Sequence, residues 1–156
     1  ELGGRTVAYV GDANNVARSL AIGAGLSGMN FRIASPAGYG FSDRDADRIA
    51  TAGVRIEVLE RPEEAVAGAD AVYADTWTSM GQEAEAEQRR RAFEGFQVDE
   101  RLMELASADA IFLHCLPAHR GEEVAADVID GAQSVVWDEA ENRLHAQKAL
   151  LDYLLG

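Results

Sequence analysis

The sequence predicts an α/β fold with three layers, in which helices cover both faces of a mainly parallel sheet of about five strands. Two observations predict it. Short apolar segments alternate along the chain with longer segments of helical periodicity, as in strands joined by crossover helices. The strand-like segments are also apolar at nearly every position, which is typical of strands buried on both faces. The 156 residues, 47% of them apolar, are sufficient for one domain with its own core.

The predicted strands are rich in apolar and β-branched residues. In chain order they are Thr6–Val10, Phe31–Ala34, Val54–Val58, Ala71–Ala74, Ala110–Leu113 and Ser134–Trp137. Helices are predicted between them, over Asn15–Ala24, from a capping box at Ser42–Asp45 to Gly53, from Pro62 to Gly68, over Asp99–Ser107 and over Glu139–Leu155. This order of elements is Rossmann-like. The charged segment 83–93 is predicted as a solvent-exposed helix, because opposite charges stand four residues apart on it.

The composition disfavours several classes of partner. A net charge of −13 argues against nucleic acid and against an anionic membrane surface, since both need clustered Lys and Arg. The one cysteine, Cys115, rules out an intrachain disulfide and fits the reducing cytoplasm, where we expect the protein. No apolar run approaches the ~20 residues of a membrane span. No metal site is predicted, because His114, Cys115 and His119 lack a second Cys or His pair at zinc-binding spacing.

Polar and reactive side chains follow four of the predicted strands. The carboxyl ends of parallel strands meet at one edge of a sheet, and ligands bind in the crevice beyond that edge. The opposite edge receives ordinary helix stops such as Gly28 and Gly53. This asymmetry predicts a binding site, without naming its ligand, in the segments Gly11–Asn15, Asp75–Gly81, His114–Arg120 and Asp138–Arg143.

Purely structural roles stay open for these residues. Asp12, Asn14 and Asn15 could turn the chain and cap the first helix, and Asp75 could cap the helix that follows it. Cys115 could be an inert core residue, as most free cysteines are. Its place just beyond a strand and before a Leu-Pro bond favours a functional thiol, whose pKa nearby donors could lower.

A nucleotide-binding function is not predicted. Gly23-Ala-Gly25-Leu-Ser-Gly28 matches the dinucleotide fingerprint in letters only, because its glycines follow a helix and precede a strand. A non-catalytic Rossmann-like binding module remains an alternative, supported best by Asp12 at a strand end. Phosphoryl chemistry of the receiver type would also need a suitably placed lysine, and the only lysine, Lys148, falls in the last predicted helix.

Four motifs carry a resemblance to the ornithine carbamoyltransferases, in the family's order and over nearly the whole chain. HCLP together with SMG separates them from aspartate carbamoyltransferases, which resemble each other around an HPLPR-like segment. Ala13 replaces the glycine that commonly precedes the Asn pair, which should alter the turn slightly. The resemblance covers the family's second domain, so residues 1–156 are expected to be that single ornithine-binding domain. The motifs are Gly11-Asp-Ala-Asn-Asn15, Asp75-Thr-Trp-Thr-Ser-Met-Gly81, His114-Cys-Leu-Pro117 and Glu139-Ala-Glu-Asn-Arg143.

The resemblance implies a role for each matched residue. Asp75, Cys115 and Arg143 would be catalytic, with Asp75 fixing the amine and Arg143 stabilising the developing negative charge. The amine proton would pass either to the Cys115 thiolate or to the leaving phosphate. The Leu116–Pro117 bond would be cis, and neither a metal nor an organic cofactor is implied. L-ornithine would be held by Asn15, Asp75, Ser79 and Met80, and carbamoyl phosphate by His114, Cys115, Leu116 and Arg143.

The implied reaction transfers the carbamoyl group of carbamoyl phosphate to the side-chain amine of L-ornithine, giving L-citrulline and phosphate in arginine biosynthesis. The family's first domain, with its Ser-Thr-Arg-Thr-Arg and His-Pro-x-Gln segments, has no counterpart in this sequence. Because alignment of two substrates contributes ~7–11 kcal/mol, we expect this chain alone to be inactive. The resemblance also implies a homotrimer, built largely through the first domain. A carbamoyltransferase with another amine acceptor is the nearer alternative.

Overall fold

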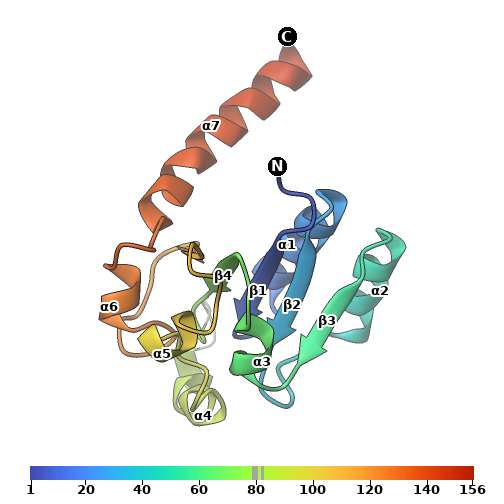
Figure 1. Cartoon of the computed structure of the whole chain (residues 1–156). Coiled ribbons are helices and arrows are strands. Elements are labelled where there is room, and N and C mark those ends of the chain that lie inside the picture. The colour runs from blue at the N-terminus through green and yellow to red at the C-terminus, as the bar shows by residue number, and fades with distance from the viewer. Residues whose placement is uncertain (79–80, 82) are drawn as a thin grey trace.

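The computed structural model describes residues 1–78, 81 and 83–156, except the side chain of Glu83. Its strands are β1 (Thr6–Val10), β2 (Asn30–Ala34), β3 (Ile56–Leu59), β4 (Ala71–Ala74) and β5 (Ile111–His114). They form one all-parallel sheet in the order β3-β2-β1-β4-β5 (Figure 1). The helices are α1 (Asn15–Leu26), α2 (Asp43–Thr51), α3 (Pro62–Val66), α4 (Ala86–Ala92), α5 (Glu100–Met103), α6 (Ala126–Ile129) and α7 (Val136–Leu155), with a 3-10 turn at Glu83–Glu85.

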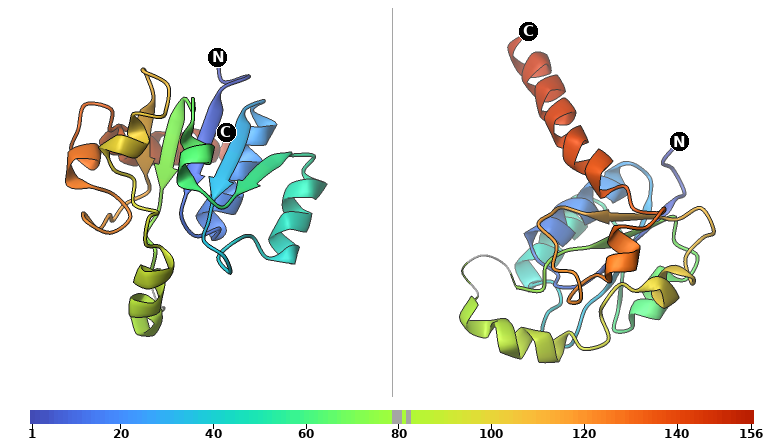
Figure 2. Two further views of the ribbon diagram at one scale, coloured as in Figure 1. Left: turned by 60° about the horizontal axis from the view of Figure 1, so that its bottom comes forward. Right: turned by 90° about the vertical axis from the view of Figure 1, so that its left-hand side faces the viewer.

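Helices cover both faces of this sheet, which confirms the predicted three-layer fold (Figure 2). Alternate strand residues point to opposite faces. Tyr9 and Phe31 pack with α1 and α2 in one apolar cluster. Val10, Val72 and Phe112 pack with α3, α5 and α6 in the other cluster. The strands are therefore apolar at successive positions because each face has its own core.

The sixth predicted strand is wrong. Ser134 makes a single bridge to Phe112, and α7 begins two residues later at Val136. Only Val136 of this helix is buried, whereas Trp137 is 67% exposed. A short apolar run fits either a strand or the first turn of a helix, and the helical stretch that follows decided the outcome. Elsewhere the predicted elements exist with small shifts in their ends, except that the helix predicted over Asp99–Ser107 ends at Met103.

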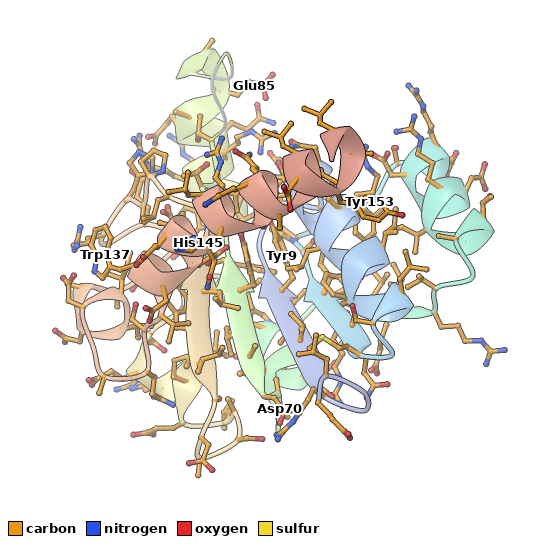
Figure 3. The ribbon with its side chains drawn as sticks, turned by 90° about the horizontal axis from the view of Figure 1, so that it is seen from above. Tyr9, Asp70, Glu85, Trp137, His145 and Tyr153 are labelled. Carbon is orange, nitrogen blue, oxygen red and sulfur yellow. The ribbon has the colours of Figure 1, made fainter. Side chains whose placement is uncertain are left out.

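Helix α7 leaves the body of the molecule (Figures 1 and 2). Its first turn contacts β5, and its remaining length extends beyond the sheet. Seen from above, Trp137 and Tyr153 lie toward its two ends (Figure 3). Leu144, Leu151 and Leu155 are exposed along it. Neither α7 nor any other helix within the described residues combines the length and the apolar character that a membrane crossing requires.

The strand order creates a crevice next to β1. The chain passes from β1 to β2 and β3 on one side and then returns to place β4 on the other side of β1. Connections therefore leave the adjacent carboxyl ends of β1 and β4 in opposite directions. Open parallel sheets bind ligands at such a point.

Candidate active site

A cavity of about 660 Å³ lies at the carboxyl edge of the sheet, where β1, β4 and β5 end. Three of the four segments predicted to form a site converge there, together with α4. The fourth, Asp138–Arg143, contributes none of the described lining residues. The residues that line the cavity include Asn15, Asp75, Thr78, Arg90, Cys115 and Leu116.

Asp75 is the buried acidic group of this cavity. It directly follows β4, and its side chain accepts hydrogen bonds from three donors among the described residues. Asn14 Nδ2 donates to Oδ2 at 2.7 Å, and the Thr76 N–H donates to Oδ1 at 2.8 Å. The Cys115 thiol donates to Oδ1 at 3.1 Å. Asp75 therefore ties together the ends of β1, β4 and β5.

Asn14 links the start of α1 to Asp75. Its side-chain oxygen accepts from the backbone N–H groups of Val16 and Ala17, which makes Asn14 the N-cap of α1. Its amide nitrogen is then free to donate to Asp75. The resemblance implied Asn15 as the ligand of this pair, and Asn15 does line the cavity with an exposed side chain. Both asparagines thus line the cavity, and Asn14 also links α1 to Asp75.

Cys115 carries a protonated thiol in this arrangement. Loss of solvent around it, the hydrogen bond to Asp75 and the negative charge of Asp75 raise its pKa to about 12, although Tyr73 opposes the shift. The expectation that nearby groups lower this pKa is therefore wrong. Thiolate is the nucleophilic and basic form, and it is scarce near neutral pH at such a pKa.

His114 is turned away from the cavity. Its side chain is fully buried, and Nε2 lies 3.2 Å from Glu123 Oε1. Residues 112 and 114 of β5 share one face, and Phe112 belongs to the core on the side of α3. His114 therefore lies next to the cavity, as predicted, but its ring is not exposed to a molecule bound there. The Leu116–Pro117 bond is cis, as the resemblance implied.

The base of α7 is fixed to the same edge by Glu139. Its carboxylate accepts from the Tyr73 hydroxyl at 2.8 Å and from the His114 N–H at 3.0 Å. Burial and the neighbouring carboxylate of Glu139 raise the pKa of Tyr73. Arg143 follows Glu139 by four residues, so it lies on the same side of the helix one turn further on, and it is exposed. The predicted contacts at Ser79 and Met80 lie outside the described residues.

Arg89 is the principal residue that the sequence did not indicate. Its side chain is only 7% exposed, although it lies in the segment predicted as a solvated helix. Its Nη1 donates to Asp12 Oδ2 at 2.7 Å and to the Trp77 carbonyl at 2.8 Å. Its guanidinium lies 5.0 Å from the centre of the Tyr39 ring. Burial raises the pKa of Asp12, and Arg89 partly offsets this effect. A buried cation thus joins α4 to the segments that follow β1, β2 and β4.

Three side chains beside the cavity have the chemistry of metal ligands. His119, Glu122 and Glu123 place one possible ligand atom each within 4.8 Å of one another, and no other such group occurs in the described part of the chain. Glu122 already pairs with Arg90 at 3.0 Å, and Glu123 Oε1 accepts the His119 N–H at 2.6 Å. These two oxygens are therefore engaged by protein donors, which disfavours a metal centre at this group.

Comparison with known proteins agrees with the motifs and the geometry. The chain is 57% identical to an ornithine carbamoyltransferase of Symbiobacterium thermophilum, covering 99% of this chain and 51% of that protein. Its fold matches the ornithine carbamoyltransferase of Pyrococcus furiosus with a TM-score of 0.88 and 52% identity, over 96% of this chain and 49% of that one. The anabolic enzyme of Campylobacter jejuni gives a TM-score of 0.91 at 40% identity, over 99% and 52% of the two chains.

The chain spans about half the length of the curated relatives it matches. Residues 3–154 match the family described as aspartate/ornithine carbamoyltransferase, Asp/Orn binding domain. The cavity lies where three of the four segments that the sequence indicated converge. The chain therefore belongs to the aspartate/ornithine carbamoyltransferase family and corresponds to its Asp/Orn-binding domain.

Proposed function

We propose that this chain is the ornithine-binding half of an ornithine carbamoyltransferase. In the whole protein, the side-chain amine of L-ornithine attacks the carbamoyl carbon of carbamoyl phosphate. The C–N bond of L-citrulline forms, the bond from that carbon to the phosphate oxygen breaks, and phosphate leaves. The observation that carries the proposal is Asp75, a carboxylate held by donors from three strand ends in a cavity open to solvent.

Asp75 suits a cationic amine because its position is fixed before the ligand arrives. Asn14, the Thr76 N–H and the Cys115 thiol donate to it, and all three residues line the cavity. An incoming ammonium group takes the place of the thiol as a charge-assisted donor. The amine, with an ordinary pKa near ~10.4, gives one proton to solvent before attack and a second as the C–N bond forms. Since the pKa of Cys115 is raised, we assign this second proton to an oxygen of the leaving phosphate.

The other half of the protein supplies most of the phosphate site in this proposal. Arg90 is the cation among the described lining residues, and Glu122 already pairs with it. We call the domain formed by that other half the companion domain. Arg143 reaches carbamoyl phosphate once α7 lies along it. Exposed Trp137 and Leu144 support such a contact, because chains rarely leave a row of large apolar side chains on one helix without a partner. The homotrimer implied by the resemblance belongs to this whole protein.

A chimera tests the proposal. This chain replaces the matching half of the Symbiobacterium thermophilum relative, and citrulline formation is measured with the isolated chain as the comparison. We expect activity in the chimera and none in the chain alone. Carbamoylation of putrescine with no reaction of ornithine would retain the reaction class and refute the acceptor. A folded chimera that carbamoylates no amine would refute the function.

Replacement of one carboxylate tests the residue that carries the proposal. Asp75→Asn should reduce kcat/KM for ornithine by about a hundredfold or more, because it removes the charge that positions the amine. Asp70→Asn is the matched control, since Asp70 precedes the same strand at the opposite edge of the sheet (Figure 3). Equal losses in the two variants would contradict the role of Asp75.

A further inference from the structure

His114 and Glu123 form a polar pair beneath the cavity, and neither side chain has exposed surface. The Leu116 N–H donates to His114 Nδ1 at 2.9 Å, so that nitrogen carries no proton. The ring proton is then on Nε2, which donates to Glu123 Oε1 at 3.2 Å. This assignment of the tautomer follows from the hydrogen bonds. The imidazole therefore has both of its nitrogen atoms occupied by protein partners.

Glu123 holds the other end of the same segment. Its Oε1 also accepts the His119 N–H at 2.6 Å, and its Oε2 lies 3.6 Å from His119 Nδ1. The backbone carbonyl of Glu123 accepts from the Val98 N–H at 2.9 Å, which anchors the residue to the core. One buried carboxylate thus connects the two ends of residues 114–119.

The segment between these ends needs such support. Leu116 has a φ of 54°, a left-handed conformation that residues with a side chain adopt at a cost. Cys115 and Leu116 both line the cavity, and the Cys115 thiol lies 3.1 Å from Asp75. A small displacement of this backbone would move both residues relative to Asp75. The hydrogen bond between the Cys115 thiol and Asp75 would lose its geometry as well.

We propose that His114 and Glu123 are positioning residues, which hold the Cys115–Leu116 backbone at the carbamoyl-phosphate side of the site and do not touch substrate. This inference rests on the proposed function for the identity of the substrate. It replaces the expectation that His114 is itself a ligand. The pair acts through the Leu116 N–H at one end and the His119 N–H at the other.

Two substitutions of His114 separate its two contacts. His114→Asn keeps an acceptor near the position of Nδ1 and loses the contact to Glu123, whereas His114→Gln keeps a donor near Nε2 and loses the acceptor for Leu116. In the active chimera we expect His114→Gln to raise KM for carbamoyl phosphate about tenfold, since small misplacements are costly to catalysis. We expect His114→Asn to raise it no more than about threefold, with KM for ornithine nearly constant in both.

His145→Gln is the control, because His145 is exposed on α7, with its Nε2 3.4 Å from Glu141 Oε1. Melting temperatures are measured for every variant. A merely structural role would lower the melting temperature and the active fraction while leaving both KM values unchanged, and that result would overturn the proposal. A larger rise in KM for His114→Asn than for His114→Gln would also overturn it. If His114→Gln fails to fold, His114→Asn decides alone, and a tenfold rise refutes positioning through Leu116.

The rate at which iodoacetamide alkylates Cys115 gives a second readout on this chain without its companion. We expect His114→Gln to increase that rate, because a released Leu116 loosens the contact between Cys115 and Asp75. An increase together with a wild-type chimera that is folded but inactive would support the positioning role and refute the proposed function. An unchanged rate in a folded His114→Gln variant would refute the positioning role, whether or not the chimera is active.

Discussion

The Cys115 thiol should react unusually slowly with alkylating reagents. It is the only cysteine of the chain, so the rate of mass gain with iodoacetamide reports on this one group. Loss of solvent and the neighbouring Asp75 raise its pKa from 9.0 to about 12. The thiolate is the reactive species, and its fraction at pH 8 is therefore roughly a thousandfold below that of an ordinary thiol.

Part of the resulting loss in alkylation rate is recovered, because a thiolate of higher pKa is the stronger nucleophile. A Brønsted coefficient of ~0.4–0.5 over a three-unit shift returns roughly fifteen- to thirtyfold. We therefore expect Cys115 to be alkylated about thirty to sixty times more slowly at pH 8 than the same thiol in the chain unfolded in guanidinium chloride. The rate in the folded chain should still increase with pH above pH 10, where the rate of the unfolded chain has levelled off.

The Asp75→Asn substitution tests whether the charge of Asp75 raises or lowers the pKa of Cys115. It removes the charged acceptor of the thiol hydrogen bond, so the pKa of Cys115 should decrease and the rate at pH 8 should increase. The remaining loss of solvent, which is the largest cause, should keep the pKa above 9.0. Asp70→Asn should change nothing. A titration midpoint below 9 in the folded chain would refute the reasoning and restore the thiolate as a candidate base.

Two further predictions concern the parts of the structure that join the site to its surroundings. Arg89→Met should lower the free energy of unfolding in urea by about 3 kcal/mol, because it leaves the largely buried Asp12 without its cation. Arg91→Met, on the exposed side of the same helix, should change it by less than about 0.5 kcal/mol. Equal changes in the two variants would show that the Asp12–Arg89 pair contributes no more to stability than an exposed arginine does. Leu144→Asn combined with Leu151→Asn should leave the stability of the isolated chain within about 0.5 kcal/mol but destabilise the chimera by about 2 kcal/mol or more, as judged by its thermal unfolding. An unchanged stability of the chimera would mean that α7 does not pack against the companion domain.

The sequence predicted the fold well because strand and helix signals alternate without ambiguity up to β5. The error at Ser134–Trp137 came from a run of apolar residues too short to distinguish a strand from a helix start. Burial separates them afterwards: Val136 faces the core, while its neighbour Trp137 faces solvent. Only the tertiary contact between α7 and β5 reveals which side of that run is covered.

The site was predicted to the level of segments, and the direction of individual side chains was harder. The orientation of His114 could have been inferred, since residues 112 and 114 alternate with 113 and Phe112 is an obvious core residue. Arg89 could not, because three arginines in succession give no local sign of which one turns inward. Its partners Asp12 and Trp77 are distant in sequence, and only the folded sheet brings them together.

The division of the site between two halves has an electrostatic reason under the proposed function. The amine acceptor is a cation, and its binding requires a carboxylate such as Asp75 that is not neutralised by a nearby arginine. Carbamoyl phosphate is an anion and requires several cations, which would pair with Asp75 if both sets shared one preformed pocket. In this chain two arginines of α4 are already paired with other carboxylates, since Asp12 engages Arg89 and Glu122 engages Arg90. If the remaining cations lie on another domain, they and Asp75 stay unpaired until the substrates lie between them. Closure of the two halves then brings the cations to carbamoyl phosphate and Asp75 to the amine, and the protein charges do not pair with each other.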